Sequence, residues 1–332
     1  MILKEMIALA VFVLPGVGNL SAEAAPVLVE TKTVSLKGVN GKLDHLDVDI
    51  RGQRLFVANK PNHTLDIVDL KTGTLLKQIP DQGKVSGVSY AADLDLIYVG
   101  NGVGTCNAFD GRDYHQVFST KAAGADNLHY HAGKQRVYVG QDEVLAALDA
   151  KTGEILAEIP LPGSVHGFSI DPSGKKIYAV LTSASVIAVI DLDKHEVSAT
   201  FPLTLSDAGS PIAQDAEQGL LFVGCPKKKP MVVVFDAISG KEIASLVIPA
   251  GIDDLHFDAK SGRLYASCSD SALIVIEKVA GEYKIVEKKE TPKDSRTCLW
   301  SEGVIYLAVP KQEGKEGPEI RIFTAQSAST KP

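Results

Sequence analysis

One short motif recurs seven times along the 332-residue chain. Each copy is a run of apolar residues around an aromatic side chain, as in residues 55–59 and 97–101. The aromatic positions lie 42, 40, 40, 44, 43 and 41 residues apart. They are Phe56, Tyr98, Tyr138, Tyr178, Phe222, Tyr265 and Tyr306. Short strands repeated at about 40–45 residues are typical of β-propellers, in which each repeat forms a four-stranded blade. The spacing therefore predicts a seven-bladed β-propeller.

The residues between the aromatic positions supply the other strands of each blade. A third strand runs into an Asp-x-x-x-Gly turn, as at residues 69–73 and 236–240, and a fourth strand follows. Asp and Gly suit such turns because Asp bonds to the local backbone and Gly tolerates a positive φ. The strands alternate or form short apolar runs, and no segment shows helical periodicity. We therefore expect an all-β fold of antiparallel blades in one domain.

The two ends of the chain indicate how the ring closes. The seventh repeat ends at residues 320–323 without a convincing fourth strand, whereas residues 32–36 near the N-terminus form a strand-like segment before the first blade. An N-terminal strand that joins the last blade would cover its exposed edge. We predict this closure.

The first 24 residues have the pattern of an export signal. Lys4 precedes an apolar stretch at residues 6–17, and Ala22-Glu23-Ala24 fits the small-x-small cleavage pattern. The apolar stretch is too short to cross ~30 Å of hydrocarbon, and no other segment reaches about 18 apolar residues, so no membrane span is predicted. We expect an exported, periplasmic or extracellular protein with a propeller at residues 25–326 and a disordered tail at residues 327–332.

Composition limits the classes of partner. With 45% hydrophobic and 23% charged residues, the chain has the composition of a globular protein. Its formal net charge of −7 argues against a nucleic-acid partner, because such proteins carry basic surfaces.

The repeats resemble those of the YVTN β-propellers, exported bacterial proteins related to the quinoprotein amine dehydrogenase and WD-repeat propellers. The best match is residues 165–178, where a strand runs into Asp-Pro-Ser-Gly and then into Ile-Tyr. Residues 55–59 and 97–101 match the Leu-Tyr-Val-Ala-Asn part of the YVTN pattern, whereas blades 5 to 7 lack its Asn. The resemblance covers the whole mature chain and implies the fold, but propellers host many unrelated activities.

The first strand of each blade is expected to line the central channel. Residues ten and eight places before the aromatic position are mostly apolar and are predicted to pack between blades, whereas the opposite parity is polar or small and faces the channel. Five of the eight histidines fall on these strands: His45, His129, His131, His166 and His256. Equivalent positions of different blades converge on one axis, so these side chains are predicted to meet.

A ligand site is therefore predicted at the channel mouth, where the first strands begin. The candidate ligand-binding residues are Asp44, His45, Asn127, His166, Asp254 and Arg296. The candidate metal ligands are His45, His129, His166 and His256, since imidazole is a common metal ligand. His166 in its Val-His-Gly turn resembles the His-Gly turn of streptogramin-lyase propellers, and gluconolactonase-type propellers hold a divalent ion at comparable hub positions. The alternative interpretation is structural: Asp49, Asp171, Asp215 and Asp258 cap turns, and His129 and His256 are half-buried.

The sequence does not decide whether the four cysteines form disulfides, bind a metal or stay free; they are Cys106, Cys225, Cys268 and Cys298. In an oxidising compartment Cys225 and Cys268, at equivalent positions of adjacent blades, could form a disulfide. The alternatives are a soft-metal site near His256 and buried free thiols.

These observations predict a monomeric binding protein or scaffold that holds a small ligand or a protein partner at the channel mouth, and they assign no definite cofactor. The alternative is a metal-dependent lyase or lactonase that uses the hub His and Asp residues and a divalent metal ion in the central channel. A third hypothesis, DNA binding, conflicts with the acidity of the chain.

Overall fold

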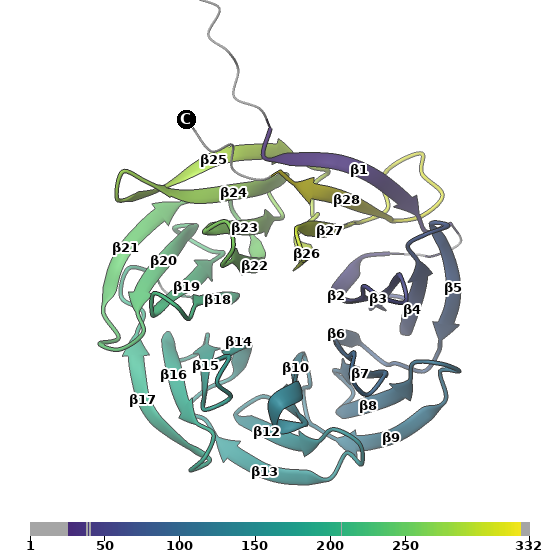
Figure 1. Ribbon diagram of the computed structural model, residues 1–332, viewed down its shortest axis with the longest axis horizontal. Coiled ribbons are helices and arrows are strands. Elements are labelled where there is room, and N and C mark those ends of the chain that lie inside the picture. Colours follow the sequence, from purple (N-terminus) through teal and green to yellow (C-terminus); the bar gives the residue numbers. More distant parts are fainter. Residues whose placement is uncertain (1–25, 38, 40, 207, 327–332) are drawn as a thin grey trace, which may run out of the picture.

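The computed structural model describes residues 26–326 except 38, 40 and 207. The predicted signal peptide and C-terminal tail lie outside the described residues. The described part contains 28 strands and one short 3-10 helix, η1 (Ala132–Lys134). The strands form seven four-stranded antiparallel sheets around a central axis (Figure 1). The structure thus confirms the predicted all-β, seven-bladed propeller.

Each blade runs outward from the axis in chain order. Blade 1 consists of β2 (Leu43–Asp49), β3 (Arg54–Asn59), β4 (Thr64–Asp69) and β5 (Thr74–Ile79). Blade 2 consists of β6 (Val85–Ala91), β7 (Leu96–Asn101), β8 (Thr105–Asp110) and β9 (Gln116–Lys121). Blade 3 consists of β10 (Asn127–His131), β11 (Arg136–Gly140), β12 (Val144–Asp149) and β13 (Ile155–Pro160). Blades 4 and 5 consist of β14 (Val165–Ile170), β15 (Lys176–Leu181), β16 (Val186–Asp191) and β17 (Glu196–Pro202); and β18 (Ile212–Asp215), β19 (Leu220–Cys225), β20 (Met231–Asp236) and β21 (Glu242–Val247). Blade 6 consists of β22 (Ile252–Asp258), β23 (Arg263–Cys268), β24 (Ala272–Val279) and β25 (Glu282–Glu290).

The seventh blade combines the two ends of the described chain. It contains β26 (Thr297–Ser301), β27 (Val304–Val309), β28 (Glu319–Ala325) and, outermost, β1 (Leu28–Ser35). β1 pairs antiparallel with β28 from Leu28 opposite Ala325 to Ser35 opposite Glu319, and the two strands lie together at the rim in Figure 1. The N-terminal strand therefore closes the ring where the sequence predicts it, although it begins four residues earlier.

The aromatic residue of each repeat is buried and links adjacent blades. All seven are at most 6% exposed. In several blades the ring packs against an aromatic ring on the inner strand of the next blade: Phe56 on Tyr90, Tyr98 on Tyr130, Phe222 on Phe257 and Tyr265 on Trp300, with ring centroids 5.1, 5.9, 5.4 and 6.3 Å apart. Such pairs stabilise beyond the area that they bury. The aromatic residue that marks each repeat in the sequence therefore also forms, in these blades, the contact between adjacent blades.

The predicted turn caps are present. The carboxylates of Asp49, Asp171, Asp215 and Asp258 each accept a hydrogen bond from a backbone N–H two or three residues on. Because these carboxylates cap turns, local structure explains why aspartate stands at these four positions.

The four cysteines are buried and none forms a disulfide. Among the described residues, no helix is long and apolar enough to cross a membrane.

Candidate functional site

A cavity of about 730 Å³ occupies the central channel. Residues of six inner strands, β2, β6, β10, β14, β18 and β22, and of β26 line it. Because the blades repeat the same strand order, the inner strands run in the same direction, and their first residues meet at one end of the channel. We call this end the mouth.

Irregular pairing at the start of the inner strands shapes the mouth. In β2 the register shifts between Leu43 and Leu46, so Asp44 and His45 fall outside the regular ladder. Similar shifts flank Ser86, His166 and Asp253, the second residues of β6, β14 and β22. A β-bulge turns side chains away from the regular alternation and is common beside functional sites. The bulges therefore determine which side chains face the mouth.

His45 and Asp254 form an ion pair across the channel. Nδ1 of His45 on blade 1 lies 3.4 Å from Oδ1 of Asp254 on blade 6, and both side chains are largely buried. Burial alone would lower the pKa of His45, but Asp254, Asp44 and Asp253 outweigh it and raise the pKa to about 10. Burial alone would raise the pKa of Asp254, but His45 keeps it below its usual value. The pair is therefore charged at neutral pH.

Two further ion pairs surround this pair. Nε of Arg296 lies 2.9 Å from Oδ2 of Asp253, and Nζ of Lys60 lies 3.0 Å from Oδ2 of Asp44. The pKa of Asp253 rises to about 6, first because it is buried and second because Asp254 adjoins it. Arg296 and Lys60 are 37% and 46% exposed at their side chains, so both cations remain accessible from solvent.

Asn127 and His166 join blades 3 and 4 at the mouth. The side-chain amide of Asn127 donates a hydrogen bond to the backbone carbonyl of His166. The side chain of His166 is exposed and also lines an adjoining hollow of about 370 Å³, together with Lys60, Ser86 and Asp126. Asn127 thus has a structural partner, whereas the His166 imidazole is presented to solvent.

The histidines deeper in the channel have other surroundings. His129 packs edge-on against Phe168, with ring centroids 4.8 Å apart. Its surface is accessible from the channel, yet the channel wall encloses it; this enclosure and the nearby His45 and His256 lower its pKa to about 4. At the end of β10, Nδ1 of His131 accepts a hydrogen bond from the N–H of Lys134 and caps η1.

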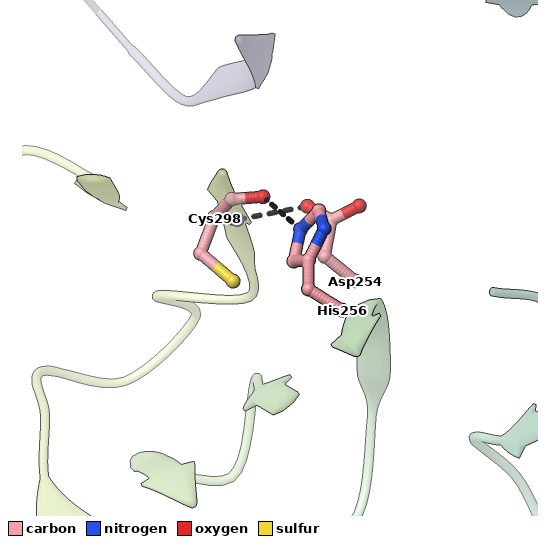
Figure 2. Close-up of side chains that lie close together, drawn as sticks. All are labelled: Asp254, His256 and Cys298. Atoms are coloured by element: carbon pink, nitrogen blue, oxygen red, sulfur yellow. Dashed lines mark hydrogen bonds between the residues drawn. The ribbon is translucent and has the colours of Figure 1, made fainter. Parts of the chain in front are cut away.

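One cluster of metal-ligand types lies in the channel wall. Asp254, His256 and Cys298 each offer a ligand atom, and these atoms lie within 4.8 Å of one another. Figure 2 shows the three side chains gathered where β22 faces β26. Oδ2 of Asp254 accepts a hydrogen bond from the N–H of Cys298 at 2.8 Å, and Nε2 of His256 lies 2.9 Å from the Cys298 carbonyl oxygen.

All six candidate ligand residues line the cavity: Asp44, His45, Asn127, His166, Asp254 and Arg296. Four of them take part in ion pairs at the mouth, and Asn127 bonds to the backbone of His166. Of the four candidate metal ligands, His256 belongs to the cluster in the channel wall. The cysteine beside His256 is Cys298. Lys60 and Asp253 were absent from the candidate set. Lys60 lies in a turn that strand alternation does not describe, and Asp253 occupies a bulge.

Comparison with known proteins supports the fold alone. No family model matches the sequence, and no curated protein matches it. The structure is similar to a chain of hydrazine synthase from Kuenenia stuttgartiensis, with a TM-score of 0.72, 89% of this chain and 98% of that chain covered, and 14% sequence identity. This chain therefore has the architecture of a known propeller, and at this identity the likeness carries no information about activity.

Proposed function

We propose that this chain is an exported β-propeller of the YVTN-repeat type that binds a small zwitterionic ligand at the channel mouth. The observation that carries the proposal is the network of His45, Asp254, Asp253 and Arg296, which three different blades bring together over the cavity. Burying charged groups costs free energy, and apolar side chains would often serve stability equally well. Charged groups gathered in a cleft with shifted pKa values are therefore candidates for a functional site.

The size and charge of the cavity support this class of ligand. Its volume of about 730 Å³ suits a small organic molecule. Among the described residues that line it, five are aspartates: Asp44, Asp47, Asp126, Asp253 and Asp254. Lys60, Arg296 and protonated His45 only partly balance them, so an ammonium group is favoured inside. The exposed guanidinium of Arg296 and ammonium of Lys60 would then bind a carboxylate of the same ligand.

A binding experiment on the mature chain, residues 25–332, tests this function. Free amino acids, dipeptides, a dicarboxylate and a polyamine are titrated, and affinity is measured by calorimetry. We expect the zwitterions to bind, and Arg296→Ala or Asp253→Asn to weaken binding by about 10-fold or more, because each removes a charge-assisted hydrogen bond. The control is Arg112→Ala, which removes an 80% exposed arginine whose partner is Asp110 in blade 2.

The proposal is wrong if none of these compounds binds, or if Arg296→Ala binds as tightly as Arg112→Ala. Export is tested separately. The full chain is expressed in a bacterial host, and mass spectrometry of the periplasmic fraction is expected to find a protein that starts at residue 25.

A further inference from the structure

We propose that Asp254, His256 and Cys298 bind a zinc ion in the wall of the central channel. The ligand types are the first support. Carboxylate, imidazole and thiolate are all zinc ligands, and a set of three protein ligands leaves one position for water or another donor. A thiolate in the set favours zinc over magnesium or calcium, which prefer oxygen ligands.

The backbone of Cys298 holds the other two side chains in place. Asp254 bonds to its N–H and His256 to its carbonyl oxygen, so both are fixed around the residue that carries the thiol (Figure 2). Asp254 and His256 are two residues apart on β22 and therefore share one face of that strand. The three groups are thus pre-positioned by two neighbouring blades rather than by one loop.

The distances suit closure around an ion. Ligand atoms around a tetrahedral zinc ion lie roughly 3.2–3.8 Å apart, given bond lengths of ~2.0–2.3 Å. The observed separations are at most 4.8 Å, so side-chain rotations that move these atoms by about 1 Å bring them into contact with an ion. On binding, the Cys298 thiol forms a sulfur–zinc bond and releases its proton to water.

The site differs from the other cluster of this kind in the described residues, which consists of Asp110, Asp113 and His115. In that cluster Arg112 donates to both carboxylate oxygens of Asp110, at 3.0 and 2.7 Å, and the other two residues are exposed. In the channel none of the three residues is exposed and one of them is a thiol, and Asp254 is also paired with His45 through Oδ1.

The experiment uses the mature chain, reduced and freed of metal with a chelator, and titrates Co²⁺ as a spectroscopic substitute for zinc. We expect one Co²⁺ per chain, a thiolate-to-cobalt charge-transfer band in the near ultraviolet, and loss of the band when Zn²⁺ is added. Cys298→Ser is expected to remove the band and to weaken zinc binding by at least ~100-fold, the upper range for loss of a supporting group. Cys106→Ser, which removes a different buried thiol, is the matched control and keeps the band.

If Cys298→Ser does not fold, X-ray absorption of the zinc-loaded wild-type protein tests the site instead. One sulfur and two or more nitrogen or oxygen ligands are expected. The inference is overturned by spectra without sulfur, by absence of binding, or by a charge-transfer band that survives Cys298→Ser. No organic ligand enters these titrations, so their outcome is independent of the zwitterion experiment. A zinc ion at this place would also supply the Lewis acid that a metal-dependent lyase or lactonase requires.

Discussion

The pKa values of two histidines in the same channel shift in opposite directions because their neighbours differ. His45 faces Asp254, Asp44 and Asp253, and its pKa rises to about 10. His129 lies against Phe168 and near two other imidazoles, and its pKa falls to about 4. Nearby carboxylates favour the charged imidazole, whereas burial without them favours the neutral one. One residue type thus serves as a fixed cation at the mouth and as a neutral ring below it.

The raised pKa of His45 predicts a loss of stability in alkaline solution. The pKa of His45 is 6.5 in a model peptide and about 10 in the folded chain. The stabilisation is therefore complete below pH 6.5 and disappears as the pH rises through about 10. Over this range we expect the free energy of unfolding of the wild type to fall by ~1–3 kcal/mol more than that of His45→Gln. Denaturant unfolding of both proteins at several pH values measures the difference, and parallel curves would contradict the assignment.

The residues of the mouth were only partly predictable from the sequence. Counting back from the aromatic position identified His45, Asp254 and Arg296, because the inner strand lies at a similar distance before the aromatic residue in each of these blades. Two further charged residues of the mouth were not identified, Asp253 and Lys60. Asp253 lies in a bulge and Lys60 in a turn, and the two-residue alternation of a strand describes neither.

At the level of strands, the sequence predicted the blades well because each strand carries its own apolar pattern and each turn its own Asp or Gly. The outermost strand is the exception. β1 begins at Leu28, but residues 30–32 are polar and not buried, so the pattern shows only the later part of the strand. Its two buried ends lie in different cores: Leu28 packs with residues of blades 6 and 7, and Val34 with residues of blades 7 and 1. β1 thus seals the ring on both sides.

This position predicts that β1 contributes strongly to stability through its two buried side chains. Leu28 is 0% exposed and Val29 is 37% exposed on the same strand. Leu28→Ala is expected to lower the free energy of unfolding by ~2–5 kcal/mol, because it leaves a cavity between two blades. Val29→Ala is the matched control and is expected to change it by less than about 0.5 kcal/mol. Chemical unfolding measures both variants. Equal, small effects would show that β1 does not hold the ring closed.

At the level of the whole molecule, seven blades leave little room where their inner strands approach one another. Gly87 on β6 and Gly167 on β14 occupy equivalent places in blades 2 and 4. A Cβ atom on Gly87 would lie 2.5 Å from the Asp126 carbonyl oxygen, and one on Gly167 would lie 2.6 Å from that of Ser210. Both oxygens belong to the backbone leading into the next blade. Glycine at these places therefore allows adjacent blades to approach closely around the channel.

Substituting either glycine is therefore expected to strain the whole ring rather than one blade. In Gly87→Ala the methyl group would meet backbone, which moves only if neighbouring blades shift, and the cost is expected to be ~1–3 kcal/mol. The control is Gly133→Ala in η1, where the nearest atom is His131 Cε1 at 3.2 Å, part of a side chain that can rotate. There alanine is expected to be neutral or stabilising, since it reduces the freedom of the unfolded chain. Thermal unfolding of both variants measures the difference. Equal melting temperatures would mean that the inner strands accommodate the methyl group at Gly87 without loss of stability, and that close approach of the blades is not required there.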